Sequence, residues 1–182
     1  MGIFGKIFGS KKLAPNDPTA QAFQGLLCHN QEDYAGAMKW YKLAAAQNYA
    51  IAQLTLGKMY RDGEGVSQDP TEAMKWFKLA AAQGDKTNGQ AQYIIGDMYR
   101  DGEGVSQDYA EAMKWFKLAA AQSDQTAGLA QFNIGNMYQN GKGVSQDSTE
   151  AIKWFKLSAA QGFVMAQFNI DKINKTGVWL PK

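Results

Sequence analysis

Near-identical segments recur along this chain, and their spacing limits the folds that it can adopt. Segments of the type MYRDGEGVSQD stand at 59–69, 98–108 and 137–147. Segments of the type EAMKWFKLAAAQ stand at 36–47, 72–83, 111–122 and 150–161. The tryptophans of these latter segments are 36, 39 and 39 residues apart. A period of this length predicts a stack of small units, each packed on its neighbours, in place of one globular core.

Each unit is predicted to begin with a helix. In the second unit Ala52, Leu56 and Tyr60 recur every four residues, which places them on one helix face. Gly63 and Gly65 then end that helix. Another glycine lies inside the first helix of three units, at Gly57, Gly96 and Gly135. Glycine in a helix costs about 1 kcal/mol relative to alanine, so its recurrence predicts a close approach of the neighbouring helix.

A second helix is predicted after the loop glycines. Asp69 is placed to be its N-cap, Pro70 fits its first turn, and Glu72 is predicted to reach back to Asp69 as a capping box. The same signal recurs at 108–111 and 147–150. We expect one buried apolar stripe on this helix, made of Ala73, Trp76, Phe77 and Ala80. Each unit is therefore a helix–loop–helix.

The units account for most of the chain. We expect an N-terminal tail over 1–16, a single solenoid domain of about four and a half repeats over 17–178, and a C-terminal tail over 179–182. The last unit departs from the pattern, because Asp171 replaces the recurrent glycine and Asn174 the recurrent tyrosine. Atypical end units are expected to cap a solenoid.

The combined pattern resembles the Sel-one-like repeat family, a relative of the tetratricopeptide repeats. In the second unit the residues that carry the resemblance are Ala52, Gly57, Met59, Tyr60, Gly63, Gly65, Val66, Asp69, Ala73, Trp76, Phe77, Ala80, Ala81 and Gly84. The resemblance implies an all-α fold, namely a right-handed α-solenoid of helix–loop–helix repeats with a tetratricopeptide-like superhelix. It also implies an adaptor that binds protein partners, and we expect a bacterial one. The cysteines that link each repeat in some secreted members are missing here.

The sequence offers little for catalysis or cofactor binding. Cys28 is the only cysteine and His29 the only histidine, and neighbours in a helix do not face each other. A catalytic dyad is therefore disfavoured, and a zinc site would depend mostly on carboxylates. The segment 63–65 lacks the third glycine of a phosphate-binding loop and the ligand spacing of a calcium loop, so a tight turn is favoured. We expect no enzyme activity, no metal and no cofactor.

The charges do not favour nucleic acid. The net charge is only +2. A row of second-helix lysines is partly neutralised by glutamates three residues earlier, and we interpret it as a solvated outer face. It comprises Lys39, Lys42, Lys75, Lys78, Lys114, Lys117, Lys153 and Lys156. No apolar segment has the length of a membrane span, and we expect a cytoplasmic protein.

The segment 2–12 has two interpretations. It places Ile3, Phe4, Ile7 and Phe8 on one helical face, with Lys6 and two later lysines beside them. Such a helix would make weak contact with a membrane surface, peripherally at the inner membrane, or dock on a partner. Its glycines weaken the helix, and a disordered tail is the alternative.

The units also differ from one another, and the differences predict a binding surface. By analogy with tetratricopeptide repeats, the inner face of the first helices is expected to hold a protein or peptide partner. The predicted contact residues are Leu54, Lys58, Arg61, Tyr93, Asp97, Arg100, Phe132, Asn136, Gln139, Phe168 and Lys172. The alternative is that the aromatic members only seal the packing between helices. A non-enzymatic interaction module is thus the favoured function; a toxin-neutralising immunity protein and, less favoured, a hydrolase are the alternatives.

Overall fold

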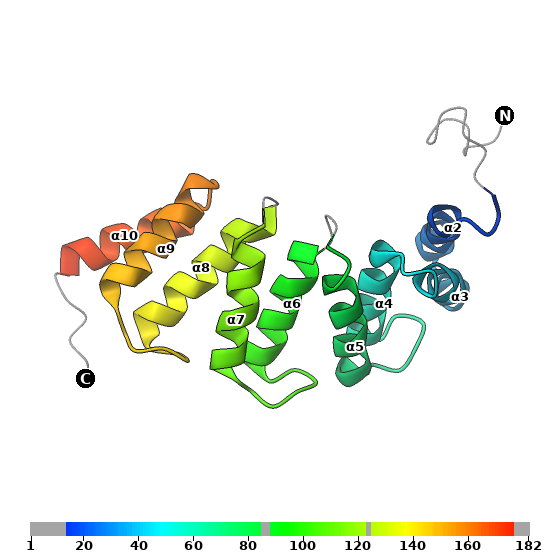
Figure 1. Cartoon of the computed structure of the whole chain (residues 1–182), viewed down its shortest axis with the longest axis horizontal. Helices are drawn as coiled ribbons and strands as arrows, with labels where there is room; N and C mark the ends of the chain where they lie inside the picture. The colour runs from blue at the N-terminus through cyan, green and yellow to red at the C-terminus, as the bar shows by residue number, and fades with distance from the viewer. Residues whose placement is uncertain (1–13, 85–87, 123–124, 177–182) are drawn as a thin grey trace.

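The computed structural model describes residues 14–84, 88–122 and 125–176, and within these ranges it contains nine helices and no strand. They are α2 (Pro18–Asn30), α3 (Tyr34–Ala45), α4 (Ala50–Asp62), α5 (Pro70–Ala81), α6 (Asn88–Asp101), α7 (Tyr109–Ala120), α8 (Gln125–Asn140), α9 (Ser148–Ala160) and α10 (Val164–Thr176). Even numbers mark the first helices of the units and odd numbers the second helices. The helix pairs follow one another along an arc (Figure 1), which is the predicted all-α solenoid. None of these helices is long and apolar enough to cross a bilayer.

The second helices begin with the predicted aspartate caps. The side chain of Asp69 accepts a hydrogen bond from the backbone N–H of Glu72 at 2.9 Å, and the aspartates of the next two units do the same. The other half of the predicted capping box is wrong. The Glu72 carboxylate pairs with Lys75 at 2.7 Å, while the backbone N–H of Asp69 donates to the carbonyl of Tyr60 at 2.8 Å. That N–H already has a partner across the loop, so the glutamate has nothing there to satisfy.

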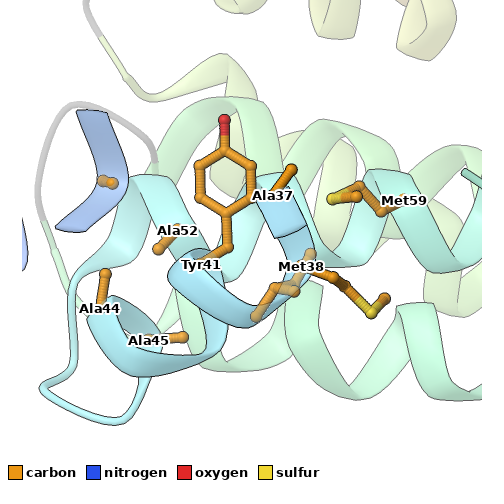
Figure 2. Packing of buried hydrophobic residues seen from close by; sticks show 9 residues of the cluster. Ala37, Met38, Tyr41, Ala44, Ala45, Ala52 and Met59 are labelled. Carbon is orange, nitrogen blue, oxygen red and sulfur yellow. The ribbon is translucent and has the colours of Figure 1, made fainter. Parts of the chain in front are cut away.

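The glycines inside the first helices touch an aromatic ring of the second helix, which confirms the predicted close approach. A Cβ atom on Gly57 would lie 2.5 Å from Cε1 of Phe77, closer than side chains can pack. The same relation joins Gly25 to Tyr41, Gly96 to Phe116 and Gly135 to Phe155. In each of these four helix pairs, one aromatic ring of the second helix therefore packs directly against the backbone of the first helix. Figure 2 shows the first of these rings, Tyr41, in a cluster built largely of alanines.

The tryptophans are less buried than predicted. Phe77 and Phe116 have no exposed surface, whereas Trp76 and Trp115 are half-buried. Trp76 packs against the cluster formed mainly by α3 and α4, and Trp115 against the cluster formed mainly by α5 and α6. The tryptophans thus lie where one unit meets the one before it, whereas the neighbouring phenylalanines are fully buried within their own unit.

The loops between first and second helices set the distance between units. Gly104 has a positive φ of 70°, and a Cβ atom on it would lie 2.5 Å from the carbonyl carbon of Pro70, at the start of the preceding second helix. Gly65 and Gly143 stand in the same relation to Tyr34 and Tyr109. Glycine is required here by the backbone angle and by the contact.

The final first helix, α10, differs from the others on the side where a second helix would pack. In the first three units a glutamine on this side is paired with one from the second helix, as Gln53 is with Gln83. In the fourth unit Oε1 of Gln131 is buried and accepts no hydrogen bond among the described residues. In α10 the corresponding Gln167 donates to Asp171 at 2.9 Å. Asp171, which stands where the earlier units have the recurrent glycine, is thus the hydrogen-bond partner of the Gln167 side chain. The expected tails over 1–16 and 179–182, including the segment 2–12, lie outside the described residues except for 14–16.

Candidate interaction surface

The predicted contact residues come from the first helices α4, α6, α8 and α10, and we call the surface that they share the first-helix face. Two of them are not available on it, because Leu54 and Gln139 are only 5 % and 7 % exposed. Lys58, Arg61, Asp97, Arg100 and Asn136 are half-buried. Phe168 and Lys172, both on α10, are exposed. The face therefore has a partly shielded polar centre and an open end at α10.

The aromatic side chains of this face also pack on the core. The ring of Tyr93 lies 5.8 Å from that of Phe116, and the ring of Phe132 lies 5.6 Å from that of Phe155. Both pairs are tilted contacts within the preferred range for aromatic rings. Phe168 is 59 % exposed, since no second helix follows α10 among the described residues. The packing alternative thus accounts for Tyr93 and Phe132, and within the described residues it does not account for the exposed Phe168.

A polar network centred on Arg100 joins α6 to α8. Its Nε and Nη2 atoms bind the Asp101 carboxylate at 2.8 and 2.6 Å. Its Nη1 atom lies 2.7 Å from Asp97 Oδ1, a charge contact without good hydrogen-bond angles, and donates to Asn133 at 3.2 Å. Asn133 in turn donates to the Tyr93 hydroxyl at 3.2 Å. Nε, Nη1 and Nη2 of Arg100 therefore all have partners, whereas Asp97 Oδ1 accepts no hydrogen bond among the described residues.

Burial governs the protonation of this cluster. It raises the pKa of Asp97, and the nearby Arg100 only partly opposes that effect. Burial likewise raises the pKa of Tyr93, with the Asp97 charge adding to it. The Asp101 carboxylate raises the pKa of Arg100, so this guanidinium stays charged. The network therefore presents fixed charges and dipoles in a partly desolvated setting, where they act strongly.

Sequence reasoning missed three members of this surface, Asp101, Asn133 and Asn169. Asn169 on α10 donates to Asn136 on α8 at 3.4 Å, which is a separate polar link between these two first helices. The sequence did contain a signal for the two asparagines. Equivalent positions of successive first helices carry Ile94, Asn133 and Asn169, and this position therefore varies between units. Only the stacking of the helices shows that this register faces the same side as Asp97.

The second-helix lysines form local ion pairs. Lys75 and Lys114 each contact the glutamate three residues before them at 2.7 Å, and Lys153 is paired in the same way. These lysines are exposed. Exposed pairs of this kind contribute little to binding or stability.

Cys28 and His29 do not pair with each other among the described contacts. His29 Nε2 lies 3.0 Å from Glu64 of the next unit, and its ring stands edge-on to Tyr34. Within the described ranges no three His, Cys, Asp or Glu side chains are close enough to hold a metal ion.

Fold and surface together define an α-solenoid repeat protein with a shielded polar face on its first helices. The Sel1 repeat matches residues 23–49, 50–85, 89–124 and 128–163, and the chain belongs to this family. Sel1 repeats typically serve as protein–protein interaction modules. No curated protein matches the chain.

Solved structures agree with this assignment. A Sel1 repeat protein from Oxalobacter formigenes is 36 % identical with a TM-score of 0.80, over 93 % of this chain and 69 % of that one. A protective antigen of uropathogenic Escherichia coli with an SLR fold is 34 % identical with a TM-score of 0.55, over 88 % of this chain but only 42 % of its own length. Cysteine-rich protein B of Helicobacter pylori shares the fold at 23 % identity and a TM-score of 0.54, over 74 % of this chain and 92 % of that one.

Proposed function

We propose that this chain is a non-catalytic adaptor that holds a protein or peptide partner along the first-helix face. The observation that carries the proposal is the contrast between two sets of positions. Positions that pack the units together carry the same residue in nearly every copy. By contrast, the half-buried position that follows the recurrent first-helix glycine carries a different residue in each of three successive units, namely Lys58, Asp97 and Asn136. Packing does not require a cation, an anion and an amide at one register, but selective recognition does.

The form of the face supports the same function. Arg100, Asn133 and Tyr93 hold one another in place before any partner arrives, which lowers the entropy lost on binding. Polar groups that are half-buried and already ordered give strong, directional contacts. We place the adaptor in the bacterial cytoplasm, in keeping with its single cysteine.

The proposal is tested by capture on the immobilised chain followed by mass spectrometry, repeated with two paired variants. Asn136→Ala with Asn169→Ala removes polar groups of the first-helix face without touching a core ring. Lys75→Ala with Lys114→Ala is the control on the second helices. The asparagine pair is expected to weaken a captured partner by at least about 2 kcal/mol, the usual threshold for a hot spot. Loss with the lysine pair and retention with the asparagine pair would place the working surface on the second helices instead.

A further inference from the structure

Two neighbouring units present the same arginine in different surroundings. Arg61 in α4 is the counterpart of Arg100 in α6, 39 residues later. Both bind the following aspartate through Nε and Nη2, and for Arg61 these bonds to Asp62 measure 2.8 and 3.3 Å. Arg100 Nη1 has Asp97 and Asn133 as further partners. Arg61 Nη1 has no hydrogen bond or ion pair among the described residues.

The substitutions between the units explain the difference. Lys58 stands at the register of Asp97, and Ile94 at the register of Asn133, so both acceptors are replaced. Lys58 itself makes no hydrogen bond or ion pair within the described ranges. Burial and the nearby Arg61 charge lower its pKa, and Asp62 opposes them only weakly. Asp62 is thus the carboxylate that acts on both half-buried cations, and the charges of Glu103 and Asp97 in the next unit also act on Arg61. Neither Glu103 nor Asp97 forms an ion pair with Lys58 or Arg61 among the described residues, whereas Arg100 has Asp97 within 2.7 Å.

An apolar cavity opens beside these cations. Its volume is about 290 Å³, and it lies between α2, α3 and the start of α4. Leu26 and Ile51, which line it, are 45 % and 48 % exposed. Leu26 occupies on α2 the register that Lys58 occupies on α4, and the lining residue Thr55 lies one helical turn before Lys58. The cavity and the cation pair are therefore adjacent parts of the first-helix face.

We propose that this end of the face binds a peptide segment in which an acidic side chain stands next to a large apolar one. The carboxylate contacts Lys58 and Arg61 Nη1, and so gives Arg61 the kind of ion pair that Asp97 gives Arg100 in the following unit. The apolar side chain enters the cavity between α2 and α4. The inference rests on the proposed function and narrows it to a class of partner. A charge-assisted contact supplies orientation, and burial of the apolar side chain supplies much of the affinity.

The test is an array of random twelve-residue peptides, capped at both ends, probed with the purified full chain. Retained peptides are expected to be enriched in Asp or Glu beside Leu, Ile, Phe or Met. Changing that acid to its amide should weaken binding at least about tenfold. The carboxylate could come from a side chain or from the C-terminus of a peptide, and a second array with free C-terminal carboxylates separates these two sources. Binding that depends on a free C-terminus and not on an acidic side chain would contradict the proposal.

Two variants make the test specific. Lys58→Asp copies Asp97 and fills the acceptor position from within, so it should abolish the preference for acidic peptides while leaving the melting temperature unchanged or higher. Lys39→Asp makes the same charge change at an exposed lysine of α3 and should retain the preference. If Lys58→Asp fails to fold, Lys58→Gln removes the cation without adding an anion and should also lose the preference.

The outcomes separate this inference from the function on which it rests. One outcome is that the retained peptides are not enriched in acidic residues and that the variant with Asn136→Ala and Asn169→Ala no longer binds them. This outcome would support the adaptor function and overturn the inference that the partner carries an acidic side chain. Equal retention of acidic peptides by the Lys58 variants and the parent would also overturn it. An array that retains no peptide at all would overturn this inference, whereas the adaptor function would still be decided by the capture experiment.

Discussion

The ring of Phe116 lies against the backbone of Gly96 so closely that a Cβ atom there would come within 2.7 Å of its Cδ1. Gly96→Ala is therefore expected to destabilise the chain. Overpacking costs about 1–3 kcal/mol, more than the roughly 1 kcal/mol that alanine gains in a helix. Thermal unfolding followed by circular dichroism measures the difference.

The control is a background in which the same substitution is expected to stabilise the chain. In a Phe116→Leu background the ring is gone, and Gly96→Ala should then stabilise by the helix propensity alone, about 1 kcal/mol. Equal effects in both backgrounds would show that the ring does not need the glycine.

Phe116 and its neighbour Trp115 should differ in their contributions to stability. Phe116 is fully buried, and Phe116→Ala is expected to cost about 3–5 kcal/mol. Trp115 is half-buried at the contact with the preceding unit, so Trp115→Ala should cost clearly less. Urea unfolding of the two variants measures both values. A larger loss for Trp115→Ala would mean that contacts between units outweigh the centre of each unit.

Asp108 and Glu111, the two residues of the half-formed capping box of α7, should also differ in their contributions to stability. Asp108→Ala removes the cap of α7 and is expected to cost about 1 kcal/mol, the usual value for a helix cap. Glu111→Ala should cost only a few tenths of a kcal/mol, because its side chain makes an exposed pair with Lys114. Similar losses in melting experiments would argue that Glu111 does reach back to the helix start in solution.

Alkaline pH should unfold the first unit through Tyr41. Burial raises the pKa of Tyr41 from 10.0 to about 12, with Cys28 adding to the effect. Because only the unfolded chain releases this proton readily, the stabilisation is complete below pH 10 and declines as pH rises toward 12. One pKa unit corresponds to about 1.4 kcal/mol, which sets an upper limit of about 3 kcal/mol. Tyr41→Phe should lose less stability than the parent between pH 10 and 12 in denaturant titrations.

Whole units should be removable, and half units should not. Deleting 91–129 removes one 39-residue period and joins Gln90 of α6 to Ala130 of α8 in the same helical register. The shortened chain should remain folded and helical. Deleting 91–110 exposes an unpaired apolar helix face and should abolish cooperative melting. Identical circular dichroism and melting for the two deletions would contradict the stack of units.

The sequence predicts most of the fold because its copies report what packing requires. Gly57, Gly96 and Gly135 recur at one position, and the structure confirms that each touches a ring. Local patterns do not encode how far one unit rotates against the next. For that reason the half-burial of Trp115 was not predicted. The partner of the Asp69 N–H was missed for another reason, because the loop folds back onto the carbonyl of Tyr60 in the same unit and the capping signal does not reveal this.

For the first-helix face, the sequence predicts which helices contribute residues and not which side chains contact one another. Lys58, Asp97 and Asn136 were identified because they vary at one register. Their neighbours Asn133 and Asn169 were missed, since the link from Arg100 to Asn133 crosses between α6 and α8. Such contacts between units depend on the geometry of the stack, which the repeat spacing alone does not contain.

The two edges of the stack differ in what fixes them. On one edge, the loop glycines such as Gly104 rest on the preceding unit and leave no room for even one extra carbon atom. On the other edge, the connections vary in length by three residues between units, and a Cβ atom on Gly84 would meet nothing within 4 Å. A reporter domain inserted after Gly84 would therefore leave the curvature of the array unchanged. The same insertion beside Gly104 would separate two neighbouring units and change the curvature.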